Sequence, residues 1–229
     1  MKRIFKKKEP KSLSEYRSSI SHENLKDENI YEEYQYKTKS DCNIGDSNNL
    51  RLKLLEEQGY ICCYCMSRVD CNNSKIEHLK PQSKYRNLQI DYQNLFISCK
   101  GGEGEKANNQ HCDTKKAEKE LKKIDLLSNI QDYIYYKKET QFIEIDSKDR
   151  DIKDDLDLLN LNISKLKRNR RNSYDNLLAQ LQKRNFKISS IKKALNYYKN
   201  KHNGKYEPYC EMIVYFLTKK LKSKGINNP

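Results

Sequence analysis

Most of the eight cysteines lie in the middle of the chain, with a spacing that is typical of a metal site. Cys62 and Cys65 form a CxxC motif, in which one tight turn aims two thiolates at the same ion. Cys99 and Cys112 can supply the two remaining sulfur ligands of a tetrahedral structural site, the geometry that zinc favours. In a reducing compartment, clustered cysteines of this kind indicate a metal more often than disulfides. The spacing therefore predicts one structural Zn²⁺ ion held by four cysteines.

Two alternatives to this interpretation follow from the same residues. A charged, glycine-rich loop separates the second cysteine pair, so Cys63 and Cys71 are open as substitute ligands. A redox role for the CxxC motif is disfavoured because the chain lacks a surrounding βαβ pattern.

Zinc would also supply folding free energy, since a chain with 35% hydrophobic residues is expected to form only small, separate cores.

An acidic residue and a histidine lie between the two halves of the cysteine pattern. They are Glu77 and His78, and Asn94 follows sixteen residues after the histidine. Asp113 and Lys116 come shortly after the last cysteine of the pattern. A zinc ribbon that only binds has no need of a histidine and an acid between its ligands, so the pattern favours a catalytic site. A non-catalytic zinc-ribbon module that binds nucleic acid or a partner is the alternative.

These motifs, over roughly Leu54–Lys116, resemble the HNH endonuclease family. Its zinc-bearing members combine a CxxC motif, an acidic residue followed by histidine, an Asn-Leu pair, and later cysteines followed by His-x-x-Lys. The chain departs from that pattern at Asp113, which stands where the family has a histidine. Further segments resemble the PtuB group, the HNH component of Septu and retron-associated anti-phage systems: Glu9–Leu13, Tyr16 with Arg17, the Cys-Cys-Tyr-Cys turn, the Ile-Glu-His triplet and Leu158–Leu161.

The resemblance implies both a fold and a function. The implied fold is α+β and mainly helical, with a zinc-stapled ββα-metal nuclease core. The implied activity is hydrolysis of phosphodiester bonds, with DNA as the default substrate and RNA, including tRNA, as the alternative. Such a protein is the effector of a bacterial anti-phage system and is controlled by a PtuA-type ATPase, with a retron reverse transcriptase and its nucleic acid as further candidate partners. Because the chain has no GxxxxGK[ST] loop, the ATPase is expected to be a separate subunit.

The expected catalytic site combines one base with one divalent cation. Phosphodiester hydrolysis needs a nucleophilic water and charge neutralisation on the phosphate, which a neutral histidine and a divalent ion provide. His78 is the expected general base, and Glu77 is an expected ligand of Mg²⁺ or Mn²⁺, which prefer carboxylate oxygen. The resemblance makes Asp113 the second ligand of this cation. His111 is a rival ligand, and Asp113 alternatively caps the helix that follows it.

The remaining candidates concern the loop after His78 and the contacts with nucleic acid. Asn94 is expected to orient this loop through side-chain hydrogen bonds, and Lys116 is expected to contact phosphate. A net charge of +14 favours a polyanionic partner, nucleic acid first, over a charged surface that only keeps the protein soluble. The candidates for binding a phosphate backbone crowd the beginning of an expected helix: Lys165, Lys167, Arg168, Arg170 and Arg171.

Three regions are expected to position these residues: 1–47 as a basic N-terminal arm with little core of its own, 48–127 as the nuclease domain with its zinc site, and 128–229 as a β-hairpin followed by helices. The patterns predict helices over 48–59, 113–127, 189–201 and 207–222 and one that begins near 163. They also predict strands over 60–65 and before 76, a compact apolar segment over 92–99, and a hairpin over 133–145. No stretch approaches the roughly 18 apolar residues of a membrane span, so a cytoplasmic location is expected.

Overall fold

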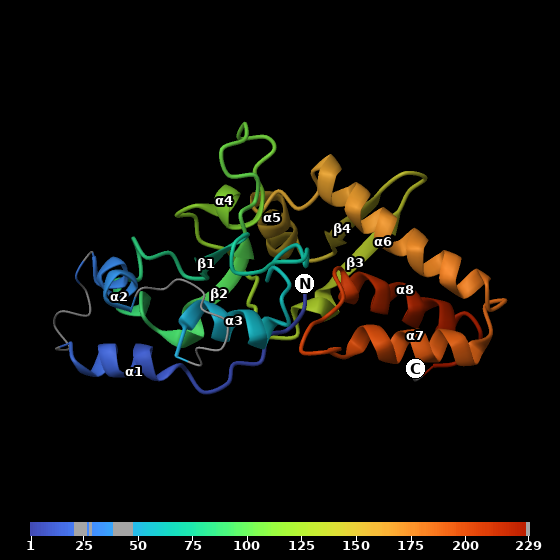
Figure 1. Cartoon of the computed structure of the whole chain (residues 1–229). Coiled ribbons are helices and arrows are strands. Elements are labelled where there is room, and N and C mark those ends of the chain that lie inside the picture. Colours follow the sequence, from blue (N-terminus) through green and yellow to red (C-terminus); the bar gives the residue numbers. More distant parts are fainter. Residues whose placement is uncertain (21–26, 28, 39–47, 228–229) are drawn as a thin grey trace.

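The computed structural model describes residues 1–20, 27, 29–38 and 48–227, which combine helices with short strands (Figure 1). In chain order the elements are α1 (Lys11–Ser18), α2 (Ile30–Thr38), α3 (Leu50–Gln58), β1 (Ser74–His78), β2 (Leu95–Cys99), α4 (Cys112–Lys116), β3 (Ile134–Lys138), β4 (Ile143–Ser147), α5 (Arg150–Leu158), α6 (Ser164–Gln182), α7 (Ile188–Lys199) and α8 (Cys210–Lys222). Within these residues, β1 pairs with β2 and β3 pairs with β4. The mixed, largely helical class predicted from the sequence is therefore confirmed.

The sheet of β1 and β2 is the element that carries the predicted site. The two strands are antiparallel, with Ser74 opposite Cys99 at one end and His78 opposite Leu95 at the other. Every residue of β2 is buried, and α3 packs against this strand. A strand over 60–65 was also expected and is wrong, since that segment contributes only an isolated bridge outside the named strands. It forms a turn instead, which brings its cysteines close to one another.

Helix α3 begins and ends with residues suited to those positions. The Asn49 side chain accepts a hydrogen bond from the backbone N–H of Leu52 at 2.9 Å, which caps the first turn. Gly59 ends the helix with φ of 62°, and a Cβ atom at this position would lie 2.5 Å from the Tyr206 ring. Glycine therefore serves both the left-handed backbone and the close approach of the chain that leads into α8.

The helix expected over 113–127 is wrong beyond Lys116. Ala117 follows α4 with φ of 48°, which ends the helical backbone. The backbone N–H groups of residues 122–124 then donate to the buried carboxylate of Asp155 in α5. A carboxylate more than thirty residues away in the sequence thus binds the N–H groups that a continued helix would have paired internally.

The N-terminal segment is more ordered than an arm with little core. Helices α1 and α2 contact each other and bury Leu13 and Tyr34. The backbone N–H of Ile4 donates to the carbonyl of Leu126 at 2.9 Å, which ties the first residues to the middle of the chain. The buried apolar residues of the described chain form one contiguous cluster. The expected small, separate cores are therefore wrong.

The hairpin and helices expected in the last third of the chain are confirmed. Strands β3 and β4 form the predicted hairpin, and α6, α7 and α8 occupy the predicted ranges within a few residues. Helices α7 and α8 pack along each other at the end of the molecule farthest from α1 (Figure 1). None of the described helices is long and apolar enough to cross a membrane. The boundaries between the three regions stay a prediction.

Candidate functional site

Four sulfur atoms converge where the turn after α3, the end of β2 and the start of α4 meet. The Sγ atoms of Cys62, Cys65, Cys99 and Cys112 all lie within 4.8 Å of one another. Two of the separations are 3.9 Å, for Cys62 and Cys112, and 3.8 Å, for Cys65 and Cys99. Zn–S bonds of about 2.3 Å give a tetrahedron with S–S edges of about 3.8 Å. The cluster therefore fits a zinc ion, and it is formed by the four residues predicted from their spacing.

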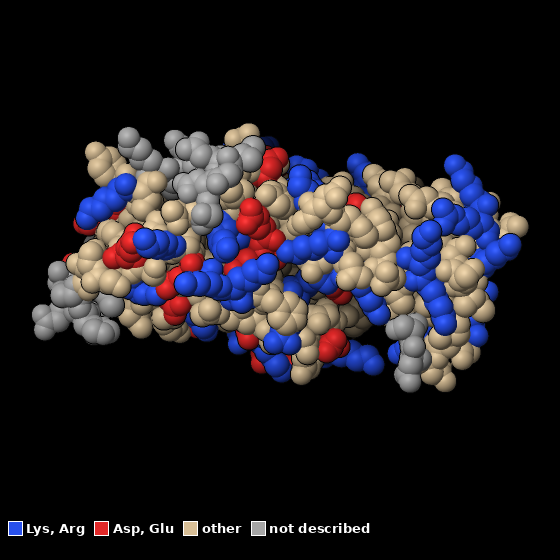
Figure 2. Space-filling model, turned by 60° about the horizontal axis from the view of Figure 1, so that its bottom comes forward, with Lys and Arg blue, Asp and Glu red and all other residues tan. Residues whose placement is uncertain are grey.

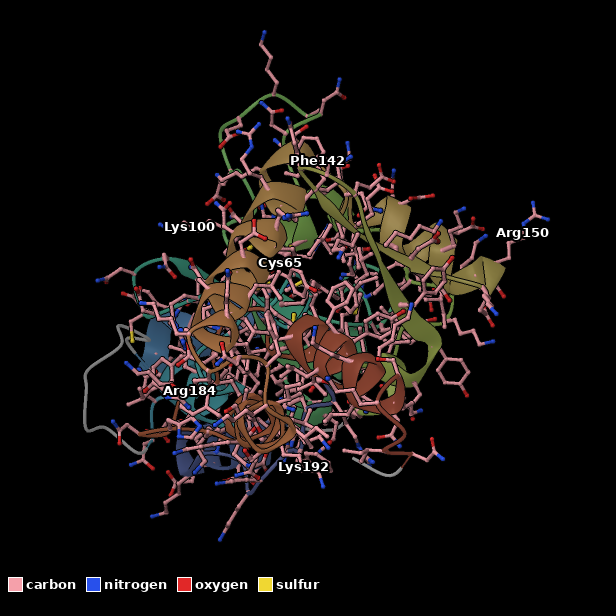
Figure 3. The ribbon with its side chains drawn as sticks, turned by 90° about the vertical axis from the view of Figure 1, so that its right-hand side faces the viewer. Cys65, Lys100, Phe142, Arg150, Arg184 and Lys192 are labelled. Atoms are coloured by element: carbon pink, nitrogen blue, oxygen red, sulfur yellow. The ribbon has the colours of Figure 1, made fainter. Side chains whose placement is uncertain are left out.

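Separate elements deliver these sulfurs to one point. The backbone N–H of Cys62 donates to Ser67 and that of Met66 donates to Cys62, so the CxxC segment closes into a tight turn after α3. Cys99 is the last residue of β2, and Cys112 is the first residue of α4. Cys65 lies among packed side chains in the interior of the molecule in Figure 3. A bound metal would hold the turn, the strand and the helix together.

Neighbouring candidates for metal binding are outside the group of four. Neither Cys63 nor Cys71 belongs to it, so the proposed substitutions of one ligand are not needed. The Nδ1 atom of His111 lies 3.2 Å from Cys112 Sγ and 3.9 Å from Cys99 Sγ. This histidine therefore faces the sulfur cluster, and its placement does not favour the rival role as a ligand of a second, catalytic cation.

His78 lies at the end of β1 in a closed environment. Its Nε2 atom is 2.9 Å from the carbonyl oxygen of Gln89, which can only accept, so Nε2 carries the proton. Nδ1 of the neutral ring is then an acceptor, and the Gln82 side-chain amide donates to it at 3.2 Å. The edge of the Tyr31 ring packs against the imidazole with centroids 4.6 Å apart. Burial lowers the pKa of His78 to about 4, so the ring is neutral near pH 7.

The carboxyl groups of Glu77 and Asp113 interact with each other. Glu77 is 1% exposed, and its Oε1 atom accepts a hydrogen bond from the Tyr64 hydroxyl at 2.7 Å. Burial raises the pKa of Glu77 well above its usual range, and the hydrogen bond and negative charge of Asp113 raise it further. Asp113 also lies 3.6 Å from the ammonium of Lys75 on β1. Two carboxyl groups held this close are a ligand pair that a divalent cation would stabilise.

Lys116 does not lie where a phosphate contact would require it. The residue is 1% exposed, and its Nζ atom is 2.8 Å from Glu77 Oε1. The same ammonium donates to the backbone carbonyl of His78 at 2.9 Å. The expected contact with nucleic acid is therefore a mistake, because the side chain turns inward to neutralise a buried carboxylate. Lys116 instead supports both residues of the Glu77-His78 pair.

Asn94 fixes the loop that follows His78. Its Oδ1 atom accepts from the backbone N–H of Lys80 at 2.7 Å, and its Nδ2 donates to the carbonyls of Lys80 at 3.0 Å and Leu88 at 3.1 Å. The loop also carries Gln82 and Gln89, the two hydrogen-bond partners of the imidazole. These contacts correspond to the loop-orienting role proposed from the sequence.

The Asn94→Ala variant is expected to lose about 2–3 kcal/mol of unfolding free energy, because truncation leaves three partly buried backbone groups without their partner. Urea denaturation at pH 7 measures this loss. The control is Gln93→Ala, since the neighbouring Gln93 is exposed. A change in Asn94→Ala no larger than the roughly 0.5 kcal/mol typical of surface substitutions would contradict the tethering role.

Arg170, one of the five cations predicted to bind phosphate, is buried. It is 2% exposed, its Nε donates to the Ile143 carbonyl at 2.8 Å, and an Nη atom donates to the Leu161 carbonyl at 2.9 Å. The prediction of a phosphate contact is wrong for this residue, because its guanidinium satisfies backbone carbonyls between α6 and the β3–β4 hairpin. Arg170 is a structural residue.

The other four predicted cations are accessible to different degrees. Lys165, Lys167 and Arg171 pair with carboxylates at 3.9, 2.9 and 2.8 Å, in that order. Arg168 is exposed, and no ion pair joins it to a carboxylate of the described chain. Ion pairing offsets much of the charge at the beginning of α6, so a phosphate contact by these four residues stays a prediction.

Several residues around the site were not found from the sequence. Tyr64 binds Glu77, Gln82 and Gln89 bind the two ring nitrogens of His78, and Tyr31 covers the ring from the N-terminal segment. Tyr64 had a usable cue, since it lies inside the CxxC motif. The glutamines and Tyr31 act through contacts that only the folded chain defines.

Comparison with known proteins gives a partial similarity. No protein-family model matches the chain. A stretch of 59 residues, 25% of the chain, is 37% identical to the Septu protein PtuB of Bacillus thuringiensis. The match covers 23% of that protein, so the similarity spans about a quarter of each chain. The chain is thus similar in part to a Septu protein.

Proposed function

We propose that the chain is a metal-dependent endonuclease of the HNH type, which hydrolyses phosphodiester bonds of nucleic acid in anti-phage defence. One observation carries this proposal: Glu77 and His78 lie at the end of β1, and neighbouring elements contribute two of the four clustered cysteines. The partner strand β2 contributes Cys99 to this cluster, and α4 contributes Cys112. His78 contributes a neutral imidazole, and Glu77 and Asp113 contribute two carboxyl groups that interact with each other. The partial similarity to PtuB supports the same reading.

His78 is prepared to accept a proton. Its bond to the Gln89 carbonyl fixes the hydrogen on Nε2 and leaves the Nδ1 lone pair directed at Gln82. Gln82 is only partly buried, so its side chain can rotate and let a water molecule take the place of its amide at Nδ1. A water in that position would lose a proton to Nδ1 as its oxygen attacks the phosphorus atom, and the bond from phosphorus to the leaving oxygen would break.

Glu77 and Asp113 are the residues that would hold Mg²⁺ or Mn²⁺. Such ions are usually bound by one or two carboxylates, with water and substrate phosphate as the remaining ligands, and this pair fits that pattern. When bound, the ion neutralises charge on the phosphate and on the leaving oxygen. In the structure, Lys116 supplies the positive charge beside Glu77, and its ammonium keeps the buried carboxylate in place.

The four-cysteine cluster has a different role in this proposal. It offers four sulfur ligands and no open position, which is the arrangement of a structural zinc site. The zinc would join the turn after α3, the end of β2 and the start of α4, and thereby bring Asp113 to Glu77. The proposed cofactors are thus one structural Zn²⁺ and one catalytic Mg²⁺ or Mn²⁺.

The burial of His78 favours the alternative of a non-catalytic binding module. The residue is 7% exposed and is enclosed by Tyr31 and Gln82. A purely structural histidine, however, does not need a neighbouring pair of carboxyl groups. We therefore place nuclease activity first and propose that substrate or partner binding opens the site.

Cleavage of nucleic acid by the purified protein tests this function. We propose a PtuA-type ATPase as the controlling partner, so the protein is incubated with and without that subunit, with supercoiled plasmid and separately with total tRNA. Nicked or linear plasmid, or shortened tRNA, is expected in Mg²⁺ or Mn²⁺ and not in EDTA. Intact plasmid and intact tRNA under every condition would leave the binding module as the better account.

A further inference from the structure

The largest surplus of positive charge lies in the C-terminal helices, beyond the cations at the beginning of α6. Residues 176–227 contain twelve Lys and Arg against two Glu. Both glutamates are engaged, because Glu211 pairs with Lys2 at 2.6 Å and Glu207 accepts from the Tyr197 hydroxyl at 2.9 Å. This segment therefore carries most of the net charge of the whole protein.

Five exposed cations lie at the junction of α6 and α7: Lys183, Arg184, Lys187, Lys192 and Lys193. No carboxylate in the described chain forms an ion pair with any of them, whereas three of the cations at the start of α6 are paired. Figure 2 shows Lys and Arg gathered on the right-hand end of the molecule, where no acidic residue is visible. Arg184 and Lys192 are labelled close to α7 in Figure 3, which views the molecule from this end. Such unneutralised charge favours a polyanion.

A pocket of about 200 Å³ opens between α6 and α7 within this basic surface. Tyr197 and Tyr198 form part of its wall, and Arg184 and Lys193 also line it. Tyr197 is 40% exposed, and its ring stacks on His202 at 3.9 Å with an interplanar angle of 15°. One face of the tyrosine ring is thus supported, and the rest of the ring is accessible to a second flat group.

Aromatic rings beside unpaired cations are the combination that binds single-stranded nucleic acid. Bases stack on aromatic side chains whatever their sequence, and cations contact the phosphates between them. A duplex offers phosphates but keeps its bases stacked inside, so it would use only the cations. The pocket is smaller than the roughly 300–1,000 Å³ of most ligand sites, which suits one base rather than a larger molecule.

We propose that the α6–α7 surface binds a single-stranded segment of nucleic acid, with one base against Tyr197 and Tyr198 and the adjoining phosphates on Arg184 and Lys193. This proposal deepens the nuclease function, because it names the form of nucleic acid that the protein holds. The surface anchors the strand at a distance from His78, so binding and cleavage are separable.

Fluorescence anisotropy with labelled 12-nucleotide single-stranded DNA, single-stranded RNA and duplex DNA tests the surface. The protein carries His78→Ala and is measured without divalent cations, so that no cleavage contributes. The Arg184→Gln/Lys193→Gln variant is expected to bind single strands at least tenfold more weakly. The slope of log affinity against log salt should become shallower by about 1.4, because two phosphate contacts are lost. The control variant, Lys148→Gln/Arg150→Gln, removes two positive charges from exposed residues elsewhere on the molecule. It should bind like the parent protein. Figure 3 shows that Arg150 lies apart from Arg184.

The base pocket has its own pair of variants. Tyr197→Leu is expected to weaken single-strand binding about tenfold and to leave duplex binding unchanged, whereas Tyr197→Phe keeps the ring and should bind normally. If both charge variants bind single-stranded oligonucleotides equally weakly, the α6–α7 surface is not the binding site and the proposal is wrong. If Tyr197→Leu binds single strands as tightly as the parent, no base stacks on this ring and the proposed base pocket is wrong. The Arg184→Gln/Lys193→Gln variant could instead bind every oligonucleotide normally but no longer associate with the ATPase. In that case the surface binds an acidic protein partner and the proposal is wrong.

These outcomes are distinguishable from failure of the nuclease function. Wild-type protein that binds single strands at this surface but cleaves nothing contradicts only the proposed function. Protein that cleaves, while the Arg184→Gln/Lys193→Gln and Tyr197→Leu variants bind as tightly as the control, contradicts only the proposed surface.

Discussion

The Cys112→Ser variant is expected to purify without stoichiometric zinc and to lose its cooperative unfolding transition. Structural zinc contributes about 10–16 kcal/mol to the folding of small metal domains. This equals or exceeds the roughly 5–15 kcal/mol by which whole domains are stable. Cys112 is fully buried, and its sulfur lies 3.9 Å from that of Cys62. A serine at this position removes one of four ligands and separates α4 from the turn after α3.

Metal analysis together with thermal melting measures both consequences. The matched control is Cys63→Ala, since Cys63 is also buried but its sulfur is outside the cluster. This control should retain one zinc per chain and show only the modest cost of a small cavity. If Cys112→Ser keeps full zinc content and melts like the control, the four-cysteine site is not what holds the region together.

The His78→Ala variant is expected to lose nuclease activity by about 10²–10⁴-fold, the usual contribution of a general base. The variant removes Nδ1, which accepts a hydrogen bond from Gln82 in the structure and would accept a proton from water once Gln82 moves away. Its zinc content should equal that of the wild type, because His78 is not in the sulfur cluster. Cleavage rates in Mn²⁺, with zinc measured on the same samples, give both quantities.

A structural role for His78 would produce a different result. Removal of a buried imidazole also costs stability, so loss of activity alone does not identify a base. Exogenous imidazole can enter the space left in His78→Gly and should restore part of the cleavage rate if the ring acts as a proton acceptor. Unchanged cleavage by His78→Ala would refute the proposed base, and loss of activity without rescue, together with a lower melting temperature, would point to a structural histidine.

Local spacing was sufficient to predict the four-cysteine cluster and much of the secondary structure. The CxxC motif fixes two sulfurs by itself, and Cys99 and Cys112 follow because zinc needs two more ligands nearby. Helix α3 was predictable because its leucines, and the glycine that ends it, lie within ten residues. Asn94 was assigned to the loop after His78, and the structure shows its side chain bonded there.

Long-range contacts explain what the sequence could not predict. Lys116 and Arg170 are two cations among the 46 Lys and Arg of the chain. Lys116 is buried because it pairs with the carboxylate of Glu77 in β1. Arg170 is buried because it donates to the carbonyl oxygens of Ile143, at the start of β4, and Leu161, after α5. The helix expected after Lys116 ends early because Asp155 binds the backbone further along. Each error thus arises where a partner distant in sequence overrides a local preference.

Anomalous diffraction from crystals of the protein soaked in Mn²⁺ tests the central claim most directly. The account predicts zinc at the centre of the four Sγ atoms of Cys62, Cys65, Cys99 and Cys112, and manganese bound by Glu77 and Asp113 beside His78. Absence of zinc from the sulfur cluster, or manganese bound elsewhere while the Glu77 and Asp113 carboxyls hold none, would contradict it.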